Sequence, residues 1–353
     1  ADDRLANFTL AHDQELIAVI KEILVLKPDL EILATPWSAP SWMKENAKVS
    51  PVDPTGYPLC GGSLKADAVA VYAYLAEFVS AYAAMGIKIS QLTIVNEPLV
   101  SGVDYPSMYT TPQTALAVSR VLSPKLPVGT KLVAYDHNCE DAMYTYLSEE
   151  FAAPADAALF PGVAIHGYGS QSIPSALPQL KNLYPDKDIY MTEITEYEHG
   201  GSFWGDLGYA AENTSIVPYN LGLSGTLYWN LVLDSHGQPN LGQHSTCYGV
   251  VTLDRDEDGS FSYSRNSAYY AMAQVAKFLD LSAANKAWAL RLETDCDDLN
   301  GAAFATEAGL VEAVLVNTGD SLLTTTVGIA GSYYSFPAEP QSVTTIAVSK
   351  GDG

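Results

Sequence analysis

Apolar positions along the first 280 residues follow two alternating patterns. Apolar residues recur every three to four positions, which predicts amphipathic helices, at 13–26, 66–85, 111–123, 141–152, 174–184, 206–221 and 268–279. Short continuous apolar runs, which predict strands, lie at 30–35, 92–95, 131–135, 163–165, 189–192 and 226–229. Because strands that are apolar throughout alternate with helices, we expect an α/β fold whose parallel strands are covered on both faces.

The pattern changes after residue 284 to closely spaced short strands separated by turn residues. These strands are predicted at 288–293, 302–306, 311–317, 324–328 and 343–348. This spacing predicts a small antiparallel β-sandwich domain. We therefore expect two domains, residues 1–284 and residues 285–353. No run of about 18 apolar residues occurs, so we expect no membrane-spanning helix.

Composition narrows the class of ligand. The 353 residues carry 18 Lys+Arg against 41 Asp+Glu, a formal charge of −23, which argues against nucleic acid as a partner because phosphates would be repelled. Only 17% of residues are charged, whereas 22 are Tyr and 5 are Trp, which suits a secreted or extracellular protein that binds flat, hydroxyl-bearing ligands. The four cysteines form no C-x-x-C pair, which argues against a zinc ribbon and leaves disulfides open.

Polar and aromatic side chains follow all six predicted strands. They are Pro36-Trp37-Ser38, Asn96-Glu97-Pro98, Asp136-His137-Asn138, His166-Gly167-Tyr168, Glu193 and Trp229-Asn230. Each alone is explained equally well as a helix cap or a loop residue. Because the carboxyl ends of parallel strands meet at one rim, six such groups together predict a site there.

Two carboxylates stand out in this set, Glu97 and Glu193, because each directly follows an uncharged apolar strand. A lone carboxylate at a buried strand end is costly and often has a chemical role. Paired acids beside Trp and Asn are what glycosidic hydrolysis needs, one acid protonated to assist the leaving oxygen and the other ionised. Trp37 and Trp229 offer faces on which a sugar ring can stack.

The chain resembles glycoside hydrolase family 30, the glucosylceramidase-like and endo-β-1,6-glucanase-like retaining β-glycosidases. The matching strings, in the family's order, are ATPWSAPSWMK (34–44), LTIVNEP (92–98), AYDHN (134–138), FPGVAIHGY (160–168), YMTEI (190–194), LYWNLVLD (227–234) and CYGVVTLD (247–254). The resemblance implies a TIM-type (β/α) barrel with a C-terminal β-sandwich, and no metal or other cofactor.

The resemblance also implies roles for particular residues. Glu97 would be the acid/base and Glu193 the nucleophile of a double displacement with retention of configuration. Asn96 would bind the sugar 2-hydroxyl. The residues that would line the first sugar subsite are Trp37, His166, Tyr168 and Trp229. Gly167 departs from the family, in which many members carry a bulkier residue between this His and Tyr.

The retaining mechanism sets two expectations for the acids. The carboxyls of Glu97 and Glu193 should lie about 5 to 5.5 Å apart, against roughly 6.5 to 9.5 Å for inversion. Burial and the charge of the nucleophile should raise the pKa of Glu97, so that it is protonated when substrate arrives.

A closed barrel needs eight strands, and the sequence predicts six. We therefore expect that this chain lacks the first two barrel strands, whether removed, supplied by a partner or absent. An open barrel would expose sheet edges, so we also expect a homo-oligomer or a partner segment that completes it.

Other interpretations of single motifs remain open. Asp254, Asp256 and Asp258 begin a D-x-D-x-D-G calcium pattern, but Arg265 stands where the loop needs Glu, so an acidic hairpin turn is favoured. His236, His244 and Cys247 have irregular spacing for zinc. Glu196 is expected to be a solvated loop acid.

The substrate expected from the resemblance is a β-glucoside or β-glucan. A glucosylceramidase-like β-glucosidase comes first, an endo-β-1,6-glucanase is the alternative within the family, and a non-catalytic carbohydrate-binding protein on a degenerate barrel is the alternative from another class.

Overall fold

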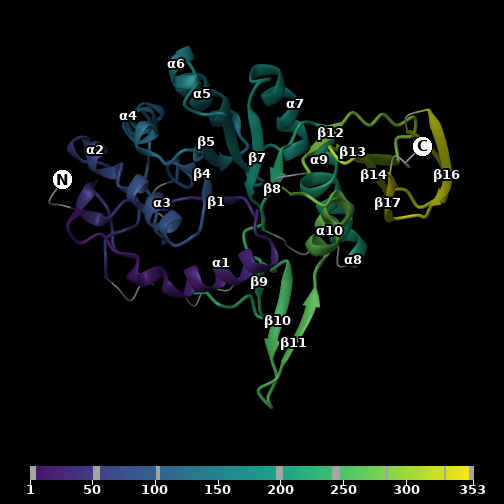
Figure 1. Ribbon diagram of the computed structural model, residues 1–353, viewed down its shortest axis with the longest axis horizontal. Coiled ribbons are helices and arrows are strands. Elements are labelled where there is room, and N and C mark those ends of the chain that lie inside the picture. The colour runs from purple at the N-terminus through teal and green to yellow at the C-terminus, as the bar shows by residue number, and fades with distance from the viewer. Residues whose placement is uncertain are drawn as a thin grey trace. The chain divides into compact units, whose positions relative to one another are not determined.

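A computed structural model describes residues 5–50, 56–100, 104–195, 202–240, 247–282, 285–329 and 331–349 (Figure 1). The chain forms two compact units. The first comprises Ala1–His166 with Asp186–Asp188, and the second Gly167–Pro185 with Ile189–Gly353. The boundary expected between residues 284 and 285 stays a prediction.

The first unit is built on parallel strands, as the apolar pattern predicts. The strands β1 (Ile32–Ala34), β4 (Ile89–Thr93), β5 (Lys131–Asn138) and β6 (Gly162–His166) are neighbours in that order, and each pair is parallel. All five residues of β6 are buried, which explains the unbroken apolar run at 163–165. A separate short antiparallel pair joins β2 (Lys44–Glu45) to β3 (Ser63–Leu64).

Helices alternate with these strands. They are α1 (Gln14–Leu26), α2 (Val69–Tyr72), α3 (Leu75–Ala84), α4 (Pro112–Leu122), α5 (Asp141–Glu150) and α6 (Pro154–Ala157). Helix α4 packs against α2 and α5, and α5 packs against β5 (Figure 1). Thr111 caps α4 by accepting the N–H of Thr114, and Pro112 occupies the first turn, where no N–H is needed. The helix predicted over 66–85 is divided at Ala73 and Tyr74.

The second unit continues the alternation. It contains α7 (Ile173–Leu183), most of β7 (Asp188–Glu193), β8 (Gly225–Thr226) and α10 (Ser267–Leu279), and β7 and β8 are parallel. The single helix predicted over 206–221 is three pieces, α8 (Phe203–Ala210), a π-helical turn (Ala211–Ser215) and α9 (Val217–Asn220). Ile216 leaves the helical region with φ −129° and ψ −71°, and this separates the last two pieces.

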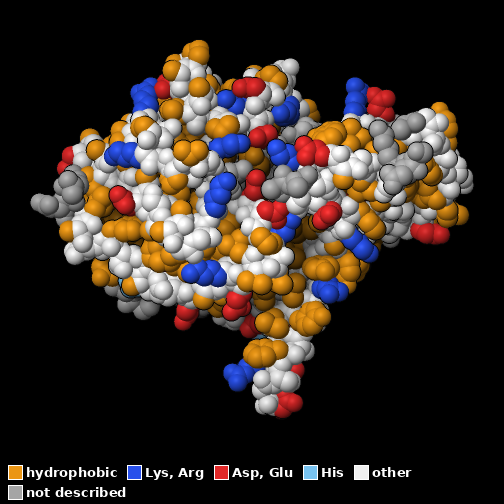
Figure 2. Space-filling model, in the orientation of Figure 1, with side chains coloured by type: hydrophobic (Ala, Val, Ile, Leu, Met, Phe, Trp, Pro, Cys, Tyr) orange, Lys and Arg blue, Asp and Glu red, His pale blue; other side chains and the backbone are white. Residues whose placement is uncertain are grey.

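A hairpin follows β8. The strand β9 (Val232–Leu233) is parallel to β10 (Val251–Arg255), which pairs antiparallel with β11 (Phe261–Arg265). Figure 2 shows hydrophobic side chains along this hairpin and acidic ones at its tip. The Asp256 N–H donates to the Ser260 carbonyl at 2.9 Å, and the Ser260 hydroxyl donates to Asp258 at 2.6 Å. The acidic hairpin turn is therefore confirmed. His244 lies outside the described residues, among which no cluster of three His, Cys, Asp or Glu is arranged to hold a metal ion.

The C-terminal part is antiparallel, as predicted. Strands β12 (Ala287–Leu290), β13 (Leu299–Thr306), β14 (Leu310–Asn317) and β17 (Ser342–Ser349) form one sheet in that order, and β15 (Leu323–Ile329) pairs with β16 (Ser332–Ala338). The sequence did not predict β16, because most of its side chains are exposed and no apolar run marks it.

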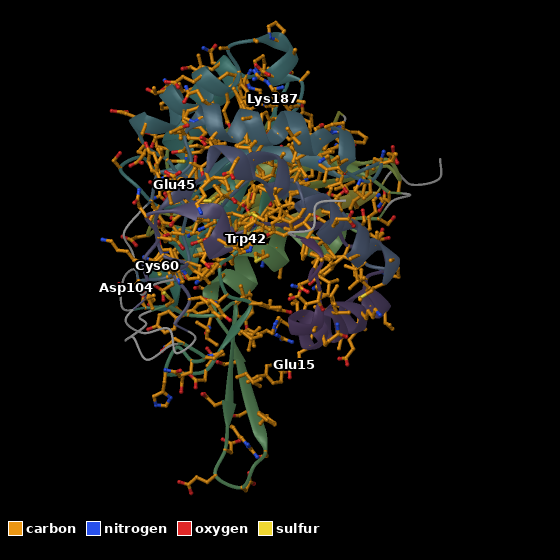
Figure 3. The ribbon with its side chains drawn as sticks, turned by 90° about the vertical axis from the view of Figure 1, so that its left-hand side faces the viewer. Glu15, Trp42, Glu45, Cys60, Asp104 and Lys187 are labelled. Carbon is orange, nitrogen blue, oxygen red and sulfur yellow. The ribbon has the colours of Figure 1, made fainter. Side chains whose placement is uncertain are left out.

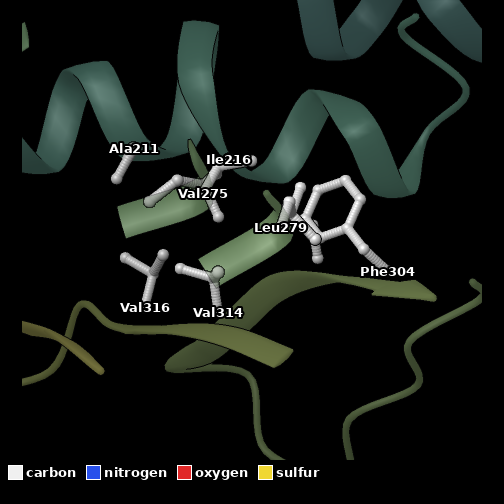
Figure 4. Packing of buried hydrophobic residues seen from close by; sticks show 8 residues of the cluster. Ala211, Ile216, Val275, Leu279, Phe304, Val314 and Val316 are labelled. Carbon is white, nitrogen blue, oxygen red and sulfur yellow. The ribbon is translucent and has the colours of Figure 1, made fainter. Parts of the chain in front are cut away.

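Two clusters of apolar side chains cover the two faces of the four-stranded sheet. On one face, Val275 and Leu279 of α10 pack with Phe304, Val314 and Val316 of the sheet (Figure 4). The other face packs against β15 and β16 through a second cluster, whose buried residues are Leu299, Ala303, Ala313, Leu315 and Val327. Alternate residues of β14 thus enter different clusters, as the two-residue period of a strand requires.

All four cysteines lie in the described part of the chain, and none of them forms a disulfide. Within the described ranges, every helix is too short or too polar to cross a lipid bilayer.

Glu312 is a buried acid within this sheet. It lies opposite Phe304 of β13 and Ala347 of β17, its side chain is 0% exposed, and neither carboxyl oxygen has a hydrogen-bond partner among the described residues. Burial raises the pKa of Glu312 from 4.5 to about 8. The folded protein therefore holds this side chain protonated at neutral pH.

Glu312→Gln should stabilise the protein increasingly as the pH rises. Between pH 4.5 and about 8 the unfolded chain ionises Glu312 while the folded chain does not, so this group lowers the free energy of unfolding across that window and adds no further change beyond it. Glutamine cannot ionise. In thermal unfolding, the Tm of Glu312→Gln minus that of the wild type should be larger at pH 8 than at pH 5 by roughly a few degrees.

The exposed Glu339 of the same domain supplies the control. Glu339→Gln removes an exposed carboxyl and should not reproduce the pH-dependent Tm difference of Glu312→Gln. An equal Tm difference at pH 5 and pH 8 for Glu312→Gln would show that its carboxyl is hydrated in the folded state.

Candidate active site

Glu97 lies beyond the end of β4, in a segment that stays bonded to both neighbouring strands. The Asn96 N–H donates to the carbonyl of Pro36 at 2.8 Å, after β1, and the Glu97 N–H donates to the carbonyl of Asp136 at 2.9 Å, in β5. Glu97 has φ +47°, a left-handed conformation that costs a non-glycine residue on the order of 1 kcal/mol. The backbone on both sides therefore holds this side chain in place.

The carboxyl of Glu97 is buried among polar groups. Its Oε2 accepts the hydroxyl of Tyr105 at 2.9 Å. Its Oε1 lies 3.5 Å from Nδ1 of His166 and 3.8 Å from Nδ1 of His137. Two imidazoles and one phenol, contributed by two strands and a loop, thus surround a single carboxylate that is only 9% exposed as a residue.

The expectation of a raised pKa for Glu97 is wrong for this structure. Burial does raise it, but the close approach of the His137 and His166 imidazoles, the charge of His166 and the hydrogen bond from Tyr105 together outweigh burial. They leave the pKa of Glu97 well below its ordinary range, because each of them favours the ionised form. The sequence signal of an isolated carboxylate after an apolar strand could not reveal these donors.

A buried lysine holds the loop that carries Tyr105. The ammonium of Lys44 donates to the carbonyls of Leu59 at 2.6 Å, Gly61 at 2.9 Å and Ser107 at 2.9 Å. Ser107 in turn accepts the N–H of Gly61 through its hydroxyl. Figure 3 shows the neighbouring residues Cys60 and Asp104 on this side of the first unit. Three carbonyls on one ammonium fix two loops together, so Tyr105 reaches Glu97 from a fixed support.

The strand β5 is irregular where it faces the site. Tyr135 and Asp136 have φ +74° and +65°, and the register with β6 shifts between Tyr135 and His137. A bulge of this kind redirects side chains. Asp136, His137 and Asn138 were expected to follow the strand, and this was wrong. The strand continues past the bulge, so these residues lie within β5.

Asp136 and His166 form a buried pair beside Glu97. Nε2 of His166 lies 3.3 Å from Oδ1 of Asp136, and each residue is 1% exposed. The other oxygen of Asp136 accepts hydroxyls from Thr35 and Thr93, each at 2.8 Å. His166 was expected to line the first sugar subsite. In the structure its ring nitrogens face two carboxyls, those of Asp136 and Glu97. His166 is also the last residue of β6 rather than the first residue of the following loop.

Trp37 and Asn96 belong to the same neighbourhood. The Trp37 ring meets the ring of Tyr105 edge-on, with centroids 5.5 Å apart, and Asn96 is buried directly before Glu97. The first unit thus brings together four predicted residues, Trp37, Asn96, Glu97 and His166.

The other predicted residues lie in the second unit. Glu193 ends β7, and its carbonyl accepts the N–H of Gly167 at 2.8 Å; the carbonyl of Ile194 accepts the N–H of Trp229 at 2.8 Å. Trp229 is 45% exposed, and Tyr168 is half-buried. The separation of the Glu97 and Glu193 carboxyls stays a prediction, and Glu196 lies outside the described residues.

The departure at Gly167 has a local structural reason. A Cβ at this position would lie 2.5 Å from Cδ1 and 3.0 Å from Cγ1 of Ile194. No side chain fits there without moving Ile194, so the isoleucine that follows Glu193 takes the space a larger residue 167 would need.

Sequence reasoning did not assign a role to Tyr105, Asp136 or the two threonines. The sequence pointed to Asp136 and His137 only as polar residues near the end of a predicted strand. Nothing in the sequence connects Tyr105 with Glu97, because the loop between them sets that contact.

Comparison with known proteins agrees with this arrangement. The model of the glycosyl hydrolase family 30 TIM-barrel domain matches residues 1–279. Endo-1,6-beta-D-glucanase neg1 of Aspergillus fumigatus is 31% identical over 294 residues, which cover 79% of this chain and 57% of that protein. Lysosomal acid glucosylceramidase of Mus musculus is 24% identical over 304 residues, covering 79% of this chain and 56% of that protein.

A solved structure of an endo-β-1,6-glucanase is also similar. It aligns with a TM-score of 0.84 at 26% identity, covering 98% of this chain and 78% of that one. The matched region of this chain corresponds to 57% of the fungal relative's length. On the match of the family model to most of the chain, this protein belongs to glycosyl hydrolase family 30, with a TIM-type barrel domain and a C-terminal β domain.

Proposed function

We propose that this protein hydrolyses β-glucosidic bonds with retention of configuration, with Glu97 as the acid/base and Glu193 as the nucleophile. The observation that carries the proposal is the environment of Glu97, a buried carboxyl that follows Asn96 at the end of a parallel strand and is surrounded by His166, His137 and Tyr105. Such a set of donors regulates the proton of a carboxyl, which is the task of an acid/base.

The two steps of the reaction require opposite protonation states of Glu97. In the first, Glu193 attacks the anomeric carbon while protonated Glu97 gives its proton to the leaving oxygen. In the second, ionised Glu97 takes a proton from the water that releases the sugar from Glu193. The donors around Glu97 favour its ionised form and so assist the second step. Protonation for the first step then requires acidic solution.

For the substrate we propose a β-1,6-linked glucan. Support comes from the greater identity to the fungal endo-1,6-glucanase, 31% against 24% for the mouse glucosylceramidase, and from the similarity to a solved endo-β-1,6-glucanase. Exposed Trp229 gives a sugar ring a face to stack on. The name of the mouse relative, a lysosomal enzyme, supports a lysosome-like compartment, and the low charge density with many Tyr and Trp supports secretion. An oligomer or a partner segment that completes the barrel remains part of the proposal.

A panel of polysaccharides and lipids tests the substrate. We expect release of reducing sugar from β-1,6-glucan, with β-anomers as first products in proton NMR, and slower turnover of glucosylceramide in detergent micelles. Faster turnover of glucosylceramide would reverse the order of the two substrates. α-Anomers would contradict retention, and binding of the glucan without turnover of any β-glucoside would leave a carbohydrate-binding protein.

Variants of the two acids test their roles. Glu97→Gln should lose on the order of 10²–10⁴-fold in kcat/KM on an alkyl β-glucoside but much less on dinitrophenyl β-glucoside, whose leaving group needs no proton. Glu193→Gln should lose activity on both, because neither substrate reacts without the nucleophile.

Azide separates the two roles further. It should give β-glucosyl azide with Glu97→Ala, by attack on the glycosyl-enzyme, and α-glucosyl azide with Glu193→Ala, by direct displacement. Glu77→Gln, an exposed site on α3, serves as the control and should behave as wild type. Full activity of Glu97→Gln on the alkyl glucoside would exclude Glu97 as the acid.

Tyr105→Phe should raise the pKa of Glu97. The tyrosine hydroxyl donates to Oε2 at 2.9 Å and favours the ionised carboxyl, so its loss makes protonation easier. Carbon-13 NMR of glutamate-labelled protein should show the Glu97 carboxyl titrating at higher pH, by a fraction of a unit to about one unit. An unchanged titration would mean that the hydroxyl does not bind Glu97 in solution.

A further inference from the structure

Asp136 sits in a place that the reaction itself does not require. It is a buried acid, 1% exposed, in a strand whose backbone is bulged and left-handed at this residue. Backbone strain at a non-glycine residue persists only where surrounding interactions hold it. The interactions here are the two threonine hydroxyls on Oδ2 and His166 on Oδ1.

Thr35 and Thr93 hold the Asp136 carboxyl in position and leave it ionised. Thr35 and Thr93 also contact each other at 2.6 Å, so their two hydroxyl hydrogens serve three contacts. At least one hydroxyl therefore donates to Asp136, which favours its ionised form. Because Thr35 directly follows β1, Thr93 ends β4 and Asp136 lies in β5, three neighbouring segments of the sheet set the position of Oδ1.

The carboxylate at Oδ1 determines which hydrogens the His166 ring carries. An ionised carboxylate can only accept, so Nε2 of His166 carries a hydrogen toward Asp136. The opposite nitrogen, Nδ1, lies 3.5 Å from Oε1 of Glu97. An imidazole between two carboxylates is stabilised in its doubly protonated, positively charged form.

We propose that Asp136 is a positioning residue that confines the acid step to acidic pH. Through Nε2 it keeps the His166 ring positively charged and oriented with Nδ1 on Oε1 of Glu97. The positive charge at that place opposes protonation of the Glu97 carboxyl. This inference rests on the proposed role of Glu97. It assigns Asp136 no contact with substrate.

The charge of His166 outweighs that of Asp136 at Glu97 because the ring lies between the two acids. Other titratable groups also face this pair within the first unit. Among its described residues these are Tyr135 and His137 of β5, Glu140 beyond it at 3.8 Å from His137, and Tyr105 of the loop. Asp136 meets His166 at Nε2, so a change at Asp136 acts on Glu97 through His166.

Asp136→Asn removes the charge and keeps the shape. The asparagine oxygen can still accept from Nε2, but the ring should lose its second proton at lower pH, and Glu97 should then hold its proton more tightly. The alkaline limb of the kcat/KM profile on an alkyl β-glucoside should move to higher pH by about one unit or more. The matched control is Asp156→Asn, which removes another ion-paired aspartate of the same unit, bound to Arg120, and should leave that limb in place.

Nitrogen-15 NMR of histidine-labelled protein tests the same link without relying on turnover. In the wild type, His166 should remain doubly protonated above the ordinary histidine range near pH 6.5, and in Asp136→Asn its titration should fall to lower pH. The wild-type spectrum decides the question even if the variant fails to fold.

Two results would overturn the proposal. One is a wild-type His166 that is neutral throughout, with Nδ1 unprotonated. The other is an alkaline limb that stays in place or moves to lower pH in Asp136→Asn. Absence of any glycosidase activity in the wild type would instead contradict the proposed function, while the NMR titration would still report on Asp136 and His166.

Discussion

The candidate site depends on the burial of one carboxylate, that of Glu97. An ionised carboxyl placed at a strand end away from water is stable only if hydrogen-bond donors replace its hydration. Here the hydroxyl of Tyr105 donates to one oxygen and the imidazoles of His137 and His166 lie within 3.8 Å of the other, and these groups approach from a loop, β5 and β6. The position of each of those elements is therefore tied to the charge on a single side chain.

Supporting contacts extend this arrangement beyond the residues that touch Glu97. Lys44 joins the carbonyls of two loops and so holds Tyr105, and burial lowers the pKa of Lys44 to about 8. Asp136, clamped by Thr35 and Thr93, holds His166. In both cases a buried charged or polar group is saturated with partners, and buried groups of this kind specify one arrangement of the chain because most alternatives leave them unpaired.

The backbone accommodates this chemistry by local departures from regular structure. The bulge in β5 and the left-handed conformations of Tyr135, Asp136 and Glu97 all occur where strands reach the site, whereas β6 and the C-terminal sheet are regular. Such conformations cost free energy, and ordinary packing elsewhere must offset it. Glu312 is the opposite case of a buried acid, since no described residue donates to its carboxyl, its pKa rises and it remains neutral.

The order of strands and helices could be predicted from the sequence, because a strand buried on both faces must be apolar throughout and a helix on a sheet must be apolar along one stripe. Glu97 and Glu193 could also be singled out as candidates, since a carboxylate directly after such a strand is unusual. These properties are local, and adjacent residues suffice to express them.

The ionisation of Glu97 could not be predicted in this way. Its pKa depends on His137, His166 and Tyr105, which lie 8 to 69 positions away along the chain and reach it only after parallel strands align and a loop folds back. The bulge at Asp136 likewise leaves no mark in the apolar pattern. Sequence alone determined which elements form and which acids are candidates, while the tertiary structure decided the protonation of Glu97, because electrostatic interactions act through space between groups that chain connectivity does not relate.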